Sequence, residues 1–255
     1  MSGISGVSNS YSSYSMYGKI ASGSRIQSAA DDAAGLAISE KLTSQENGLN
    51  KGTQNAQSGQ DLLNVSDGAL GSITDNLQRI RELAVQASSG LLTDSDKKDI
   101  RAEVDQLKQG IGDIADQTTF NTKPILNGDS SLSMATDSNG NSVSVNTTNA
   151  TLSALGIEDF DVTGDFSIDT IDKALDKVTT ARAKGGAQYN ALSSTISYNN
   201  YAAQNTAASN SRIEDLDIPK ALTDLTKQNL LNTYKIFMQK SANAAAQNRN
   251  TVLFR

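Results

Sequence analysis

The sequence contains no cysteine and no histidine. Their absence excludes disulfide bonds, thiolate nucleophiles and imidazole bases, and it removes the side chains that zinc and copper prefer as ligands. Tryptophan is also absent, and five phenylalanines and seven tyrosines among 255 residues offer little material for the core of a compact enzyme. Any catalysis would depend on carboxylates, lysine, serine or tyrosine, and we expect no metal and no organic cofactor.

Paired acidic residues are the one pattern that suggests catalytic chemistry. The pairs are Asp31-Asp32 and Glu214-Asp215. Adjacent residues on a helix point about 100° apart, so these carboxylates do not converge on one substrate atom. Helix capping and subunit contacts explain them better. The sequence also contains no glycine-rich phosphate loop and no metal-ligand spacing, and it therefore predicts a protein that is not an enzyme.

The net charge of −6 is unevenly distributed along the chain. Residues 1–30 hold two basic residues and no acidic one, and residues 219–255 hold six basic residues against a single aspartate, so the acidic excess lies in residues 31–218. An acidic middle argues against nucleic acid as a partner, because phosphate binding needs a basic face. No apolar run approaches the roughly 18 residues of a membrane span, and the start of the chain lacks the pattern of a cleaved signal peptide.

A seven-residue apolar repeat extends from about Leu49 to Ala87. Its inward positions are small in the first half and larger in the second, namely Leu49, Gly52, Ala56, Gly59, Leu63, Ser66, Leu70, Ile73, Leu77, Ile80, Ala84 and Ala87. A period of 3.5 residues sustained over this length predicts a helix that winds against partner helices and does not lie on a sheet. The small residues of the first half would permit close approach of another helix.

Two further apolar stripes predict partners for this helix. After Ser89-Gly90, Asp94 or Ser95 can cap a second helix, and the short connection implies that it packs antiparallel to the first. Its apolar positions are Ile100, Val104, Leu107, Ile111 and Ile114. A third pattern, with Gly185-Gly186 as a weak point, comprises Ile171, Leu175, Val178, Leu192, Ile196, Ala203, Ile213 and Leu216. We therefore predict a mainly α fold, an elongated antiparallel helical bundle or coiled coil.

Residues 121–163 differ from the helical segments around them. They are rich in serine, threonine, asparagine and glycine, and the alternation Ser142-Val143-Ser144-Val145 follows the turn signal Asn139-Gly140-Asn141. This pattern predicts a β-hairpin within a polar excursion that has too little apolar material to be an independent domain. The serine and threonine content also suits O-glycosylation, although a solvated loop explains the composition more simply.

The two terminal segments carry weak apolar faces among many polar residues. Near the N-terminus the face comprises Ile4, Val7, Tyr11, Tyr14, Gly18 and Ala21; after Pro219, which suits a helix start or bend, it comprises Leu222, Leu225, Leu231, Tyr234, Met238 and Ala242. Serine and glycine reduce helix stability, and a narrow apolar stripe adds little to it. Each segment should therefore become ordered only against a partner.

Several blocks of the sequence resemble bacterial flagellins. Residues 22–38, Ser-Gly-Ser-Arg-Ile-Gln-Ser-Ala-Ala-Asp-Asp-Ala-Ala-Gly-Leu-Ala-Ile, are similar to a flagellin signature, and residues 77–86, Leu-Gln-Arg-Ile-Arg-Glu-Leu-Ala-Val-Gln, resemble another. A third signature is similar to Thr119-Phe120-Asn121. The family's C-terminal hallmark is similar to Ser211-Arg212-Ile213-Glu214-Asp215. The blocks follow the family's order at both ends of the chain.

This resemblance implies a structural subunit of the bacterial flagellar filament, used for motility. Residues 1–33 and 219–255 would form the inner core of a helical homopolymer, and residues 34–218 a rod around it that includes the polar region at 121–163. The assembly contacts would come from Ile4, Val7, Tyr11, Tyr14, Leu222, Leu225, Leu231, Tyr234 and Met238. The resemblance further implies export without a cleaved signal peptide, an extracellular location in the filament, and as partners an export chaperone and the flagellar cap and junction proteins.

The resemblance also implies a partner outside the flagellum, the innate immune receptor Toll-like receptor 5. In the family, the stretch that matches residues 77–86 and a glutamate of the following helix form the receptor-binding surface. The matching residues here are Gln78, Arg79, Arg81, Glu82, Leu83 and Glu103. The alternative is that the charged residues are solvated or form ion pairs between helices; Leu77 and Ile80 belong to the core, whereas Arg79 and Leu83 lie off the apolar seam.

Two rival interpretations remain within structural proteins. A flagellin-like hook–filament junction protein would share the helical ends, and a secreted coiled-coil translocator or adhesin is more distant. The intact Asp-Asp-Ala-Ala-Gly and Arg-Glu-Leu-Ala-Val blocks favour flagellin itself. The N-terminal segment is shorter than is usual in the family and lacks its Ile-Asn-x-Asn opening, so we expect the two terminal helices to pair unequally.

Overall fold

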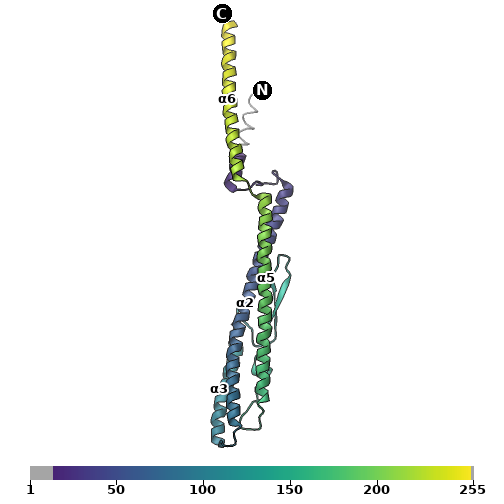
Figure 1. The fold of residues 1–255 in the computed structure, drawn as a ribbon, viewed down its shortest axis with the longest axis vertical. Coiled ribbons are helices and arrows are strands. Elements are labelled where there is room, and N and C mark those ends of the chain that lie inside the picture. The colour runs from purple at the N-terminus through teal and green to yellow at the C-terminus, as the bar shows by residue number, and fades with distance from the viewer. Residues whose placement is uncertain (1–13, 254–255) are drawn as a thin grey trace. The chain divides into compact units, whose positions relative to one another are not determined.

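The computed structural model of the chain describes residues 14–253, and most of these residues are helical (Figure 1). The long helices are α2 (Ala33–Ala87), α3 (Asp94–Gln117), α5 (Asp169–Glu214) and α6 (Ile218–Leu253), and α4 (Leu152–Leu155) is a single turn. The strands are β1 (Thr119–Phe120), β2 (Lys123–Pro124), β3 (Ser131–Ala135) and β4 (Ser142–Asn146). None of the helices in the described part of the chain is long and apolar enough to cross a membrane.

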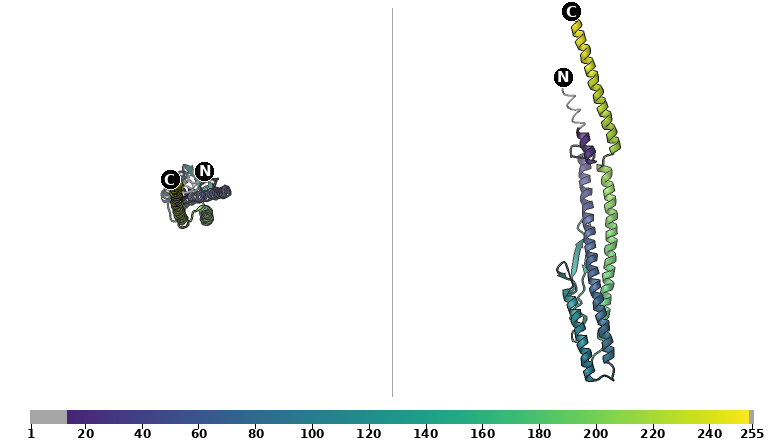
Figure 2. Two further views of the ribbon diagram at one scale, coloured as in Figure 1. Left: turned by 90° about the horizontal axis from the view of Figure 1, so that it is seen from above. Right: turned by 90° about the vertical axis from the view of Figure 1, so that its left-hand side faces the viewer.

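The chain divides into two compact units, each made from separate stretches of sequence. One comprises residues 1–44 and 205–255, and the other comprises residues 45–204. The second unit contains most of α2 and α5 and all of α3, which run side by side (Figures 1 and 2). This arrangement confirms the predicted antiparallel helical bundle.

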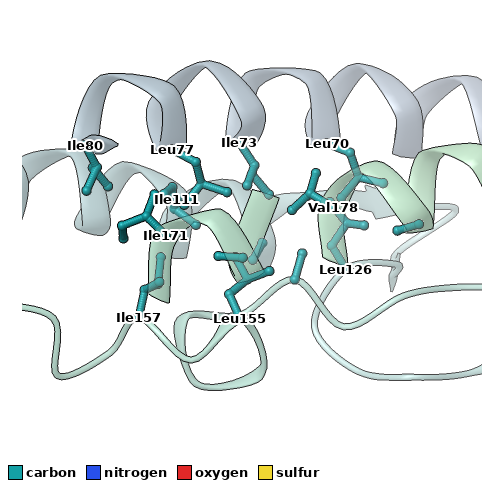
Figure 3. Close-up of a cluster of buried hydrophobic side chains, with 14 of the residues drawn as sticks. Leu70, Ile73, Leu77, Ile80, Ile111, Leu126, Leu155, Ile157, Ile171 and Val178 are labelled. Carbon is teal, nitrogen blue, oxygen red and sulfur yellow. The ribbon is translucent and has the colours of Figure 1, made fainter. Parts of the chain in front are cut away.

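The apolar seam of α2 forms the centre of the second unit. Every predicted inward position from Leu49 to Ala87 is buried except Ser66, which is partly exposed. In the second half of the seam, Ile73, Leu77 and Ile80 are fully buried and face α3, α5 and the segment after α4 (Figure 3). Full burial of an isoleucine or leucine side chain contributes about 1.5–3 kcal/mol, so this seam accounts for much of the unit's stability.

The start of α3 differs slightly from the prediction. Thr93, and neither Asp94 nor Ser95, is the N-cap: its hydroxyl accepts the Asp96 N–H, and the Asp96 carboxylate accepts the Thr93 N–H at 2.9 Å. This reciprocal capping box uses aspartate where glutamate is more usual, which is why the sequence pattern did not identify it. The hydrogen bonds from the backbone and hydroxyl of Thr93 hold the pKa of Asp96 below its ordinary value.

Helix α5 continues without a break through Gly185-Gly186, the predicted weak point. An ideal Cβ on Gly185 would lie in ordinary contact with Leu63 of α2, at 3.8 Å, so packing supports the helix there. Two ion pairs of opposite polarity join α2 to α5, because the arginine lies on α2 in one pair and on α5 in the other. Arg81 Nε lies 2.6 Å from Asp172 Oδ1, and Arg182 Nε lies 2.8 Å from Asp67 Oδ1. The order of these partners shows that α2 and α5 are antiparallel.

The polar excursion is more tightly packed than its composition suggests. The predicted hairpin is present, with Ser133 opposite Ser144 in the β3–β4 register. Most apolar residues of the region are buried in the same cluster as the α2 seam, in contrast to the solvated loop that we expected: Ile125, Leu126, Val145, Ala150, Leu155, Ile157, Phe160 and Val162. A few well-placed apolar side chains are sufficient because α2, α3 and α5 supply the rest of the core.

A second, smaller hairpin pairs β1 with β2 and was not predicted. Its two turn residues, Asn121 and Thr122, have φ values of 47° and 65°. Two consecutive positive φ values are typical of the tight turns that match strand twist, and they usually require Asn-Gly or Asp-Gly. Threonine rarely adopts this conformation, so the residue types at this position do not indicate a turn.

Glycines at and beside the start of the α2 seam accommodate the β3–β4 hairpin. An ideal Cβ on Gly52 would lie 2.3 Å from the Thr136 carbonyl oxygen, and one on Gly48 would lie 2.7 Å from the Ser138 Cα. Asn199 of α5 donates from its buried amide to the same Thr136 oxygen at 2.6 Å. Gly48 and Gly52 therefore serve close approach of a hairpin backbone, whereas the sequence suggested close approach of a helix. Gly59 serves both, because a Cβ there would lie 2.9 Å from Met134 Cε of β3 and 3.0 Å from Leu192 Cδ1 of α5.

Replacing Gly52 by alanine should lower stability, because the added methyl group overlaps the backbone of Thr136. We expect a loss of about 1–3 kcal/mol, typical of overpacking, measured by urea unfolding monitored by circular dichroism. Gly68→Ala is the matched control on the same helix, since a Cβ there meets nothing within 4 Å. It should stabilise the helix by roughly 0.5–1 kcal/mol. A Gly52→Ala variant as stable as the control would contradict the packing argument.

Candidate interaction surfaces

The first unit joins the two ends of the chain through a short contact that we call the clasp, residues 23–26 with residues 213–216. The Arg25 N–H donates to the Glu214 carbonyl at 2.6 Å, and the Leu216 N–H donates to the Gly23 carbonyl at 2.8 Å. Ser24 and Asp215 form an isolated antiparallel bridge between these two bonds. Gly23 has a φ of 70°, a conformation that favours glycine.

Side chains strengthen the clasp on both sides. The Arg25 guanidinium donates to the Ile213 carbonyl at 2.5 Å. The Glu214 carboxylate accepts from the Ser39 hydroxyl and from the Asn210 amide, and Ser39 is buried. The clasp thus combines the Ser-Gly-Ser-Arg block with the Ser-Arg-Ile-Glu-Asp block. Each block is recognisable in the sequence by itself, but nothing in the sequence pattern indicates that the two blocks touch.

The two residues of the acidic pair Asp31-Asp32 have different structural roles, and one of them is the predicted helix capping. Asp32 caps α2, because its carboxylate accepts the Gly35 N–H at 2.8 Å and its carbonyl accepts the Leu36 N–H. A Cβ on Gly35 would lie 2.8 Å from the Ile26 Cδ1 and closer still to the Asp32 carboxylate. Glycine at this position therefore lets the helix start pack against Ile26, which is buried. Helix α2 begins here, at Ala33, well before the predicted start at Leu49.

The Asp31 carboxylate organises the loop that precedes α2. It accepts the Lys19 ammonium at 2.7 Å and the backbone N–H groups of Gln27 and Ser28 at 3.2 Å. The hydrogen bond from Lys19, followed by that from the Gln27 backbone, holds the pKa of Asp31 below its ordinary value. The carboxylate thus connects the helical segment 14–22 to the loop and remains ionised in mildly acidic solution.

Helix α6 exposes large apolar side chains on more than one side. Leu230, Tyr234 and Phe237 follow the i, i+4, i+7 spacing of one face and are 60–69% exposed. Leu231 and Met238, seven residues apart on a neighbouring face, are half exposed. Helix α6 thus leaves uncovered an apolar surface that continues over two faces.

The structure divides the predicted assembly residues into three groups. Ile4, Val7 and Tyr11 lie outside the described residues. Tyr14, Leu222, Leu231, Tyr234 and Met238 are exposed apolar side chains. Leu225 is already buried, together with Ala221 one turn earlier. Leu225 therefore contributes to the folded chain itself, and it is less available for contacts with another subunit.

The predicted receptor-binding residues lie together on α2 and α3, with Arg79 at their centre. Arg79 Nη2 lies 2.8 Å from Glu103 Oε1 on α3, and Arg79 Nη1 lies 3.1 Å from Glu82 Oε2. All three side chains are about half exposed or more, and Gln78 is exposed beside them. The arrangement is an ion pair between helices on an accessible surface, as one of the two alternatives predicted for these charged residues.

Arg81 and Leu83 have different environments from Arg79. Arg81 pairs with Asp172 of α5. Leu83 is 2% exposed and belongs to the core cluster, so its predicted position off the seam is wrong. Leu62 lies three heptads earlier and is buried as well. Because α2 contacts more than one partner, its buried stripe is wider than the two heptad positions that a simple coiled coil uses.

No group of acidic side chains in the described residues is arranged to hold a metal ion. The described part of the second unit does contain a cavity of about 250 Å³ between α2, α5 and the end of β4. Its floor includes Leu63 and Leu70, and the Asp67–Arg182 ion pair lies at its edge. Two of its polar groups are therefore already paired with each other.

Replacing Lys19 by methionine should raise the pKa of Asp31 toward the usual value of about 3.9. In the wild type the depressed pKa means that the carboxylate contributes stability above pH values near the usual one. That contribution is lost as the pH falls through the lower pKa of the folded state. A carboxyl-detected NMR titration measures the pKa of Asp31 in the wild type and in the variant. Lys41→Met, which removes an exposed lysine of α2, is the control and should leave Asp31 unchanged; equal values in all three proteins would contradict the Lys19 contact.

Comparisons with known families identify both halves of this architecture. Residues 5–131 match the bacterial flagellin N-terminal helical region, and residues 168–251 match the bacterial flagellin C-terminal helical region. Among curated proteins, the chain is 36% identical to the flagellar filament 31.3 kDa core protein of Treponema maltophilum, over 92% of this chain and 90% of that protein. It is 37% identical to the flagellin of Halalkalibacterium halodurans, over 90% and 87%.

Solved structures agree with this assignment. The crystal structure of Bacillus cereus flagellin is 27% identical with a TM-score of 0.50, and the match covers 57% of this chain and 88% of that chain. A protein from Vibrio parahaemolyticus proposed to be flagellar hook-associated has a TM-score of 0.61 over 72% and 100%, but at 13% identity it shows a shared fold alone. The chain belongs to the bacterial flagellin family, a family of structural proteins that polymerise into the flagellar filament and are not enzymes.

Proposed function

We propose that α6, together with the N-terminal segment, is the surface through which this chain joins the filament. The observation that carries the proposal is the exposed apolar surface of α6. A helix with apolar residues on several sides is normally buried on several sides. Among the α6 side chains that the structure describes, only Ala221 and Leu225 are buried. Neighbouring copies of the same chain would cover the remaining faces.

The same observation supports folding coupled to assembly. Isolated helices gain most of their stability from packing of an apolar face, and α6 buries little of its own surface within the chain. Residues 1–33 and 219–255 would therefore become fully ordered when several subunits bury their apolar faces together. These contacts join different surfaces of successive copies and do not close on themselves, so they generate a helical filament. Residues 34–218 would form the layer outside this core.

An exposed surface of this kind also needs protection before assembly. Contiguous apolar surface promotes unwanted association, so we expect an export chaperone to cover the C-terminal segment. Export would leave the N-terminal segment uncleaved, and the assembled chain would be extracellular, in contact with cap and junction proteins at the ends of the filament. The support for these partners is the family and the uncovered faces of α6.

Replacing Tyr234 by serine should impair polymerisation without unfolding the rod, because Tyr234 is exposed in the single chain. Losing a buried aromatic contact of roughly 1.5–3 kcal/mol would raise the critical concentration about tenfold or more. Seeded growth followed by electron microscopy measures this concentration. Lys235→Gln, the next residue on the same helix, is the control and should grow long tubular filaments like the wild type. Normal growth of Tyr234→Ser, or wild-type protein that forms only short caps, would contradict the proposal.

A second proposed activity is recognition by Toll-like receptor 5 through Gln78, Arg79, Arg81, Glu82 and Glu103. Its support is the residue-for-residue resemblance and the accessible cluster around Arg79. Glu103 and Glu82 hold the Arg79 guanidinium in place, which lowers the entropy that a receptor contact would cost. Leu83 is buried and would act by supporting this surface, not by touching the receptor.

Binding of the soluble receptor ectodomain should fall in Arg79→Ala, by about 2 kcal/mol or roughly 30-fold if Arg79 is a central contact. Arg182→Ala is a matched control, because Arg182 is similarly exposed and, like Arg79, pairs with a carboxylate of another helix. It should bind within about twofold of the wild type, a difference that surface changes commonly cause. Equal affinity of Arg79→Ala and wild type would remove Arg79 from the site.

A further inference from the structure

The dipeptide Asn-Gly occurs three times in the sequence, at Asn47, Asn127 and Asn139. An asparagine followed by glycine can deamidate spontaneously, because the unhindered glycine nitrogen can reach the side-chain carbonyl carbon. The reaction needs a flexible backbone and an unengaged side-chain amide. The three sites differ strongly in both respects, although their local sequences are alike.

Asn139 differs from the other two sites in that both the asparagine and the glycine after it are exposed. It lies in the exposed turn between β3 and β4, and Gly140 after it is exposed and has a φ of 84°. The Gly140 N–H makes a long hydrogen bond to the Asp137 carbonyl, 3.4 Å, and its other contact is with the solvent-accessible carboxylate of the same residue. In the described part of the chain, residues 14–253, the side-chain amide of Asn139 has no hydrogen-bond partner, although its backbone N–H does.

The other two sites are restrained in different ways. Asn47 and Gly48 lie inside α2, where the backbone must leave the helix before the Gly48 nitrogen can attack. The Asn127 side chain donates to the Asp116 carboxylate at 2.9 Å, so its amide is engaged. The sequence predicts a turn at Asn139, and the structure shows what restrains the other two sites.

We propose that Asn139 is a site of spontaneous deamidation that alters the tip of the β3–β4 hairpin. The Gly140 nitrogen bonds to the Asn139 side-chain carbon, the carbon–nitrogen bond of the amide breaks, and ammonia leaves with the proton from Gly140. Water then opens the succinimide ring at either carbonyl, which gives aspartate or isoaspartate. No oxidant or reductant takes part, and solvent supplies the water.

The product would disturb a closely fitted contact. Ser138 packs against the bare Gly48 backbone, and the Asp137 carboxylate accepts the N–H groups of Asn139 and Asn141 at 2.8 Å. Isoaspartate adds one carbon to the main chain between these groups, and either product adds a negative charge beside Asp137. The turn should therefore hold the Gly48 face of α2 less firmly, and amide exchange at Thr136 should accelerate, since its N–H bonds to Asn141 at 2.9 Å.

The test uses the full chain incubated in mildly alkaline buffer. Peptide mass spectrometry follows the conversion of amide to acid at the three asparagines, and an isoaspartate methyltransferase assay identifies the isomer. We expect Asn139 to convert at least about tenfold faster than Asn47, which corresponds to roughly 1.4 kcal/mol for opening the helix. Conversion at Asn139 no faster than at Asn47, or slower than at Asn127, would overturn the proposal.

Asn139→Ser provides a variant with an intact turn residue and no side-chain amide. It should lose the isoaspartate of the hairpin peptide and the accelerated exchange at Thr136, while the rate at Asn127 stays that of the wild type. Because the position is exposed, circular dichroism should show unchanged folding. Undiminished total isoaspartate in this variant, or unchanged exchange at Thr136 after conversion of the wild type, would contradict the proposed site or its effect.

Discussion

Burial of the α2 seam is the interaction on which the second unit depends. The polar excursion has too few apolar residues for a core of its own, and α3 and α5 each present one stripe that needs a partner. Helix α2 meets all three, because its buried surface is wider than a two-position heptad stripe and includes Leu62 and Leu83. The ion pairs at its edges add direction to this packing. Exposed pairs of this kind contribute little energy, but their opposite polarity favours a single antiparallel register.

The sequence was sufficient to predict the features that depend on periodicity. The inward positions from Leu49 to Ala87 and the β3–β4 hairpin follow from spacing and from one turn signal, and both are present. The start of α2 at Ala33 was missed because residues 33–48 carry no sustained apolar stripe; their helix is fixed by the Asp32 cap and the Gly35 contact. Such contacts depend on tertiary neighbours, which a local pattern does not contain.

The candidate surfaces show the same division. Arg79 and Glu103 are exposed, and so are most of the α6 residues that were predicted to make assembly contacts, as a role in binding would require. The burial of Leu83 and Leu225 does not, because burial depends on how many neighbours a helix has and not on its own repeat. The purpose of Gly52 was also misjudged: spacing revealed that a small residue is required, and only the structure showed that a hairpin backbone occupies the space.

The clasp between the chain ends has a consequence for the order of folding. Its partners are about 190 positions apart in the sequence, and closing a flexible loop of that length costs roughly 5 kcal/mol of entropy. A few hydrogen bonds cannot offset this cost in an unfolded chain, so the helices between them must form first and shorten the effective loop. A chain that stops before Glu214 leaves the Arg25 N–H without its acceptor. The contact therefore cannot form until the chain has been made as far as Leu216.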